Sequence, residues 1–158
     1  MTQIMAPVGI VSMRVTRSRF EVGDRPADEM RLVLDVDFDA GDIEEREGLD
    51  EYQLSIILSV TSRLVSTTDE EDVRAEAMAE VATRVATSRR IGNSAKALEY
   101  LRLNGVSMAY AHARSYIMTM AALSPMGSLI LPPILPEQLI KSQLGGDGPD
   151  EGGDGAEA

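Results

Sequence analysis

The residues that could do chemistry are few. The only histidine, His112, lies in the stretch AYAHARS, and the chain has no cysteine. Histidine changes its charge near neutral pH and can act as a general base, but the sequence has no Gly-x-Ser-x-Gly turn to present a serine nucleophile. We therefore interpret His112 as a surface or interface residue, and a general base or pH-sensitive group is the alternative.

Two acidic stretches, DVDFD (residues 35–39) and DIEERE (residues 42–47), are the candidates for a metal site. In an extended strand Asp35, Asp37 and Asp39 share one wet face and do not converge on an ion. Neither stretch has EF-hand spacing, and no glycine-rich loop is present to hold a phosphate. The lack of cysteine also excludes a disulfide scaffold, a thiolate zinc site and a cysteine nucleophile. We predict a binding protein without metal or cofactor, not an enzyme.

Composition limits the partners. The 158 residues suggest one domain, and 44% of them are hydrophobic, which is enough for a core. With 26 Asp and Glu against 15 Lys and Arg, the net charge is -11, so nucleic acid is not an expected ligand. A basic partner and simple solubility both remain explanations of the acidity. Aromatic residues are 4% and methionines number 9, so apolar surfaces must be aliphatic and adaptable.

The sequence predicts a soluble, cytoplasmic protein without stable membrane insertion. The start, MTQIMAPVGIVSMRV, has no basic region followed by a long apolar core, as a signal peptide would. No apolar run approaches the roughly 20 residues that a membrane-spanning helix needs.

Four segments are predicted to be strands: residues 8–20, 30–39, 52–65 and 73–87. The second and third alternate apolar and polar residues, as strands with one buried face do. The fourth is ambiguous, because its alanine and glutamate content favours a helix. Its alternation and the short acidic turn before it favour a hairpin strand, which we predict. Residues 40–51 are predicted to be a polar loop.

A long helix is predicted to follow, capped by Ser94 and running to about Leu123. Asn104 and Gly105 are a point where it could split or kink. The stretch SLILPP (residues 128–133) is expected to be extended, since residues before proline avoid the helical region. Pro136 suits the first position of a short helix, and the Gly- and acid-rich residues 145–158 are expected to be a disordered tail.

These elements predict an α+β fold, with a four-stranded antiparallel sheet, a long helix, an extended proline-rich connector and a short C-terminal helix. The predicted domain covers residues 1–144, followed by the tail. One helix and one sheet carry more apolar surface than they can hide from each other, so we expect an oligomer. The predicted interface residues lie on the long helix: Ala109, Ala113, Arg114, Ile117 and Met120.

The helix, connector and tail together resemble the SecB family of export chaperones. AHARS (residues 111–115) lies where that family has a Pro-Tyr-Ala-Arg-Glu stretch and retains Ala113 and Arg114. LILPPILPEQL (residues 129–139) lies where the family's connector does, and RSRFEVGD and YQLSIILSVT resemble the end of its first strand and its third strand. The departures are Ala111 and His112 for Pro-Tyr, Ser115 for Glu, Pro136 for an aromatic residue, and the scarcity of aromatic residues. The chain resembles a divergent member.

The resemblance implies an ATP-independent holdase that binds unfolded polypeptides or preproteins and passes them to the SecA motor. It also implies a homotetramer built as a dimer of dimers. Glu76 and Glu80, on the wet sheet face, are the residues expected to dock SecA's basic tail. The alternative is an adaptor for one partner, such as the antitoxin of a toxin–antitoxin–chaperone system, and a scaffold subunit is a third hypothesis.

The connector is the predicted client groove, because its prolines hold apolar side chains apart with little freedom to collapse. The groove residues are predicted to be Met126, Leu129, Ile130, Leu131, Pro132, Pro133, Ile134 and Leu135. Plain core packing between the two helices is the alternative. If the groove interpretation holds, Leu131→Asp weakens client binding and leaves the oligomer intact.

Overall fold

The computed structural model describes residues 8–23, 29–69, 71–124 and 129–144. Met126 and the predicted disordered tail, residues 145–158, lie outside the described residues. The elements are β1 (Val8–Val22), β2 (Met30–Ala40), β3 (Glu44–Arg46), β4 (Glu51–Ser66), β5 (Val73–Ser88), α1 (Ser94–Ala122) and α2 (Pro136–Leu144). Two 3₁₀ turns, Glu47–Leu49 and Arg89–Ile91, precede β4 and α1.

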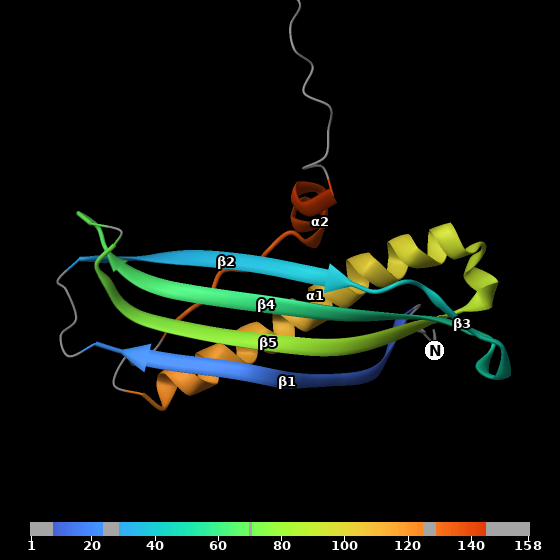
Figure 1. The fold of residues 1–158 in the computed structure, drawn as a ribbon, viewed down its shortest axis with the longest axis horizontal. Coiled ribbons are helices and arrows are strands. Elements are labelled where there is room, and N and C mark those ends of the chain that lie inside the picture. Colours follow the sequence, from blue (N-terminus) through green and yellow to red (C-terminus); the bar gives the residue numbers. More distant parts are fainter. Residues whose placement is uncertain (1–7, 24–28, 70, 125–128, 145–158) are drawn as a thin grey trace, which may run out of the picture.

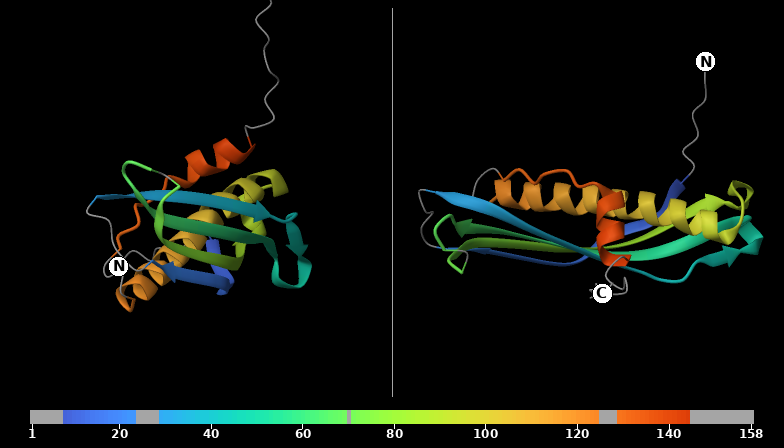
Figure 2. Two further views of the ribbon diagram at one scale, coloured as in Figure 1. Left: turned by 60° about the vertical axis from the view of Figure 1, so that its left-hand side comes forward. Right: turned by 90° about the horizontal axis from the view of Figure 1, so that it is seen from above.

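The strands form one antiparallel sheet in the order β1-β5-β4-β2, and α1 crosses one face of it (Figures 1 and 2). This confirms the predicted α+β class with four long strands. The loop predicted over residues 40–51 is wrong in part, because it contains β3, which pairs with the start of β4. Three consecutive charged residues carry no apolar alternation, so the sequence pattern gave no sign of this strand.

The ambiguous fourth segment is the strand β5, as predicted, and it lies between β1 and β4. Pairing on both sides outweighs the helical preference of its alanines. Ala75, Ala77 and Ala79 lie buried on the face that α1 covers. These small side chains let the helix approach the sheet closely.

Helix α1 is continuous, and its N-terminal cap lies one residue before the predicted one. The Asn93 side chain, not Ser94, accepts the backbone N–H of Lys96 at 2.9 Å. The Asn104-Gly105 pair does not break the helix. Gly105 faces the sheet, where an added Cβ would lie 2.5 Å from Ile56 Cδ1 and 3.1 Å from Val85 Cγ2. Glycine is thus required here by close packing.

One core fills the space between the inner face of the sheet and α1. Its largest wholly buried side chains come from β4, from α1 and from the connector: Leu54, Ile56, Leu58, Leu101, Ile117 and Leu131. Among the described residues, no helix lies on the outer face of the sheet (Figure 2). This face carries charged side chains, among them Arg63, Glu76 and Glu80. The chain therefore has a layer of helix and connector on one side and a bare sheet on the other.

Candidate functional site

The connector, residues 129–135, alternates between core and surface. Leu129 and Leu131 point inward and are 9% and 0% exposed, whereas Ile130 and Leu135 are 73% and 63% exposed. Pro132 and Pro133 are also exposed, and Ile134 is half-buried. An extended chain presents successive side chains to opposite sides, which explains the pattern. Plain packing therefore describes Leu129 and Leu131, and groove lining stays a prediction for the exposed residues.

The connector is fastened to α1 through its backbone carbonyls. The Tyr110 hydroxyl donates to the carbonyl of Pro132, and the Arg114 Nε–H donates to the carbonyl of Leu131 at 2.7 Å. Prolines offer no N–H, so carbonyls are the groups by which such a segment can be held. Figure 2 shows the connector running beside α1 before α2 begins. The apolar side chains that point outward are thus held in fixed positions.

Burial raises the pKa of the Tyr110 hydroxyl, and the positive charge of Arg114 partly offsets this. We expect Tyr110→Phe to lower the free energy of unfolding at pH 7 by about 1 kcal/mol, because the hydrogen bond to Pro132 is lost. In the wild type, the unfolded chain releases the Tyr110 proton near pH 10, below the pKa of the folded chain. Stability should therefore fall as the pH rises through that range.

Urea unfolding of both proteins between pH 7 and pH 11 measures this. The difference between the wild type and Tyr110→Phe should shrink above about pH 10. A difference that stays constant with pH would contradict the buried environment of the hydroxyl.

Two recesses lie along α1 on the same side as the connector. The first, of about 570 Å³, follows the C-terminal half of the helix and is lined by Ala111, Arg114, Ser115, Met118, Thr119, Ala122 and Leu123. The second, of about 470 Å³, lies where the connector meets α2 and is lined by Leu103, Asn104, Ser107, Leu135, Pro136, Glu137, Gln138 and Lys141. The layer of helix and connector therefore carries both exposed apolar side chains and recesses.

The residues predicted to form the oligomer interface differ in exposure: some are buried within the chain and others are exposed. Ala109, Ala113 and Ile117 are buried against the sheet of their own chain, so they present no surface to a second copy. Arg114 is occupied by the connector, and Met120 is exposed. Other exposed positions on the C-terminal half of α1 are Ala111, Ser115 and Thr119, and the exposed Leu123 follows the helix directly. His112 is also exposed.

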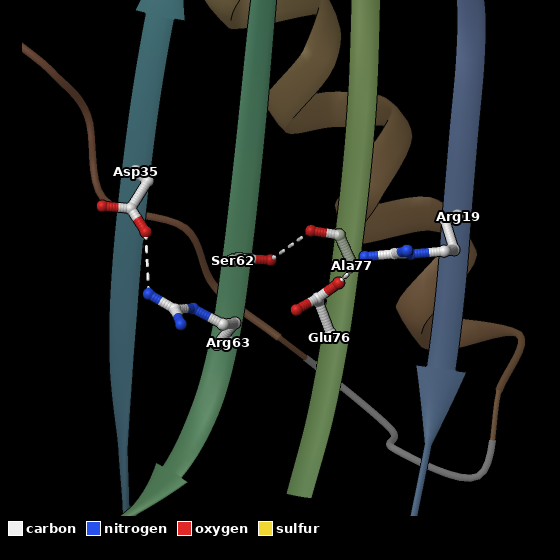
Figure 3. A network of polar contacts seen from close by, with 6 residues as sticks. All are labelled: Arg19, Asp35, Ser62, Arg63, Glu76 and Ala77. Carbon is white, nitrogen blue, oxygen red and sulfur yellow. Dashed lines mark hydrogen bonds and ion pairs between the residues drawn. The ribbon is translucent and has the colours of Figure 1, made fainter. Parts of the chain in front are cut away.

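The outer face of the sheet carries several ion pairs. Glu76 pairs with Arg19, and Glu80 pairs with Arg17 at 3.2 Å and accepts the Thr16 hydroxyl at 2.9 Å. Figure 3 shows the Arg19–Glu76 pair and the Asp35–Arg63 pair on this face. A basic partner that docked on Glu76 and Glu80 would have to displace arginines of the same chain. The predicted docking site is therefore already neutralised.

Within the ranges that the structure describes, no group of three or more His, Cys, Asp or Glu side chains could hold a metal ion. No helix in the same ranges is long and apolar enough to cross a membrane.

No protein-family model and no curated protein matches the sequence. Among solved structures, the chain is similar to the Mycobacterium tuberculosis Rv1957 SecB-like chaperone in complex with a ChAD peptide from the Rv1956 HigA1 antitoxin, with a TM-score of 0.56 and 16% identity. The match covers 81% of this chain and 91% of that one. It is also similar to a protein of unknown function from Streptococcus agalactiae, with a TM-score of 0.45, 12% identity and coverage of 79% and 96%. The fold is SecB-like, in a divergent sequence.

Proposed function

We propose that the chain is an ATP-independent chaperone that holds apolar segments of unfolded or extended polypeptides. The observation that carries the proposal is the connector. Ile130 and Leu135 are largely exposed, although Leu129 and Leu131 beside Ile130 are buried and the carbonyls of Leu131 and Pro132 accept hydrogen bonds from α1. Held in this way, the two side chains offer apolar area that a client could cover.

The rigidity of the connector supports binding. Three prolines and the two bonds from Tyr110 and Arg114 restrict the segment before a client arrives. A client therefore loses less of its binding energy to ordering the site. Burial of apolar area then contributes about 25 cal/mol per Å². The scarcity of aromatic residues leaves aliphatic and methionine side chains to supply this area, and these adapt to varied sequences.

A second candidate function is a dedicated chaperone for one partner, such as an antitoxin. The SecB-like structure described above was solved with an antitoxin peptide, which favours this candidate. We do not propose that the chain delivers clients to the SecA motor. Glu76 and Glu80, the residues expected to dock SecA's basic tail, already pair with arginines of the same chain.

Light scattering of an aggregating unfolded protein, with and without this chain and without ATP, tests the proposal. Suppression at stoichiometric amounts, beyond that of an acidic soluble control protein, is the expected result. If the chain is folded and suppresses no aggregation, general holding is excluded and the dedicated chaperone is favoured.

We also propose that copies of the chain assemble through the exposed apolar residues at the C-terminal end of α1. Leu123 is 80% exposed there, and Met120 and Met118 lie within the same turns of the helix. Small neighbours, Ala111 and Ser115, would let a second helix approach. A dimer of dimers is the assembly proposed, and the mass from static light scattering decides it. A monomer at all concentrations would overturn this part of the proposal.

A further inference from the structure

Arg102 is a half-buried cation where α2 packs beside α1. Its side chain lines a recess of about 440 Å³ between the two helices, together with Leu98, Leu103 and Ile140. Its Nε atom is buried and has no hydrogen-bond partner among the described residues. A buried donor on a charged group is costly when it is unsatisfied, so this position favours a ligand that brings an acceptor.

The other charged residues of this recess lie nearer to solvent. Glu99, Glu137 and Lys141 are exposed, and neither glutamate forms an ion pair with Arg102 within the described ranges. Exposed charges are screened by water and salt, whereas a half-buried guanidinium is screened less. A ligand that enters the recess therefore meets Arg102 beside apolar walls, and an acidic group on the ligand is the complement to that cation.

The recess continues toward the connector. Leu103, Glu137 and Lys141 line it, and they also line the neighbouring recess of about 470 Å³ where the connector meets α2. That second recess includes Leu135, one of the two exposed connector residues on which the proposed client site rests. A polypeptide that covers Leu135 can therefore extend along α2 as far as Arg102.

We propose that Arg102 binds an aspartate or glutamate side chain of the client while neighbouring apolar residues of the client cover the connector. This inference rests on the proposed function and adds the chemistry of the client to it. The guanidinium donates to the carboxylate, and the apolar walls of the recess strengthen the bond by lowering the local dielectric constant. The net charge of -11 repels an acidic client at long range, so any preference for one must come from this local contact. Arg102 thus selects among the apolar segments that the connector can hold.

Pairs of fluorescent probe peptides test the inference. Each peptide is an extended segment of leucine and serine with one aspartate, whose position varies along the set, and its twin has asparagine instead. Fluorescence anisotropy with the full chain should give, for at least one position, a dissociation constant about tenfold lower for the aspartate peptide, because a hydrogen bond to a charged group forms. In Arg102→Gln the twins should bind equally. Arg14→Gln is the matched control, since it removes the charge of an exposed arginine on β1 and should leave the preference unchanged.

Arg102→Lys provides a second variant in case Arg102→Gln does not fold. It keeps the charge but not the planar fork of donors, so the preference should decrease without being lost. Equal binding of all twins to the wild type would overturn the role of Arg102 and leave the proposed function standing. A preference that persists in Arg102→Gln would overturn it as well, because another cation would then hold the carboxylate. If no peptide binds, the inference fails, and the aggregation assay decides separately on the proposed function.

Discussion

Leu131→Asp is expected to unfold the protein, rather than to weaken client binding selectively as the sequence led us to predict. Leu131 has no exposed surface and lies in the core beneath α1. Removal of a buried leucine costs about 2–5 kcal/mol, and burial of an unpaired carboxylate costs several kcal/mol more. The sum is comparable to the whole stability of a small domain, about 5–15 kcal/mol.

Circular dichroism with thermal melting measures this, and the neighbouring residue provides the control. Ile130→Asp makes a similar chemical change one position away, on the exposed side of the connector. It should alter the free energy of unfolding by no more than about 0.5 kcal/mol. If Leu131→Asp melts like the wild type, the connector does not dock on α1 as described, and the division between inner and outer residues fails.

The connector shows what a sequence pattern leaves undetermined. Pro132, Pro133 and Pro136 predict an extended segment, and alternation of inner and outer residues follows from that. All residues of the segment 129–135 are apolar, however. The pattern therefore does not say which of its two sides faces the core. Tyr110 and Arg114 decide it by binding the carbonyls of Pro132 and Leu131. Those partners are 22 and 17 residues away in sequence.

The strands were predictable because β2 and β4 alternate apolar and polar residues over most of their length, with Val33 and Ile57 as exceptions. The buried face of α1 was not, because small residues occur all round the helix. Ala113 faces the sheet and Ala111 faces outward, although both are alanines. Only the packing of β4 and β5 against Gly105 and its neighbours fixes the rotation of the helix.

The ion pairs that Glu76 and Glu80 form with arginines could not be predicted from the sequence either. They depend on the register of β1 against β5, which shifts between Val15 and Arg17. Beyond that irregularity Arg17 lies opposite Glu80, and Arg19 reaches Glu76. Registers of edge strands are set by the folded sheet, so sequence alone could place these glutamates on the outer face but could not give them partners.

The double variant Ile130→Asp with Leu135→Asp is expected to abolish most of the suppression of aggregation while the chain stays folded. Each side chain is more than half exposed, so the fold loses little. Each would bury an apolar area worth about 1.5–3 kcal/mol when a client covers it. The amount of chain needed for half-maximal suppression should therefore rise at least about tenfold.

The matched control is Val11→Asp with Leu49→Asp, since these residues are also exposed and line a separate recess of about 580 Å³ beside the start of β1. It changes the net charge by the same amount, so repulsion between an acidic chain and an acidic client would affect both variants equally. Suppression that survives in the control and fails in the connector variant places client binding on the connector. The reverse result would move the site to the recess beside β1, where an unpaired edge strand could bind a client through its backbone.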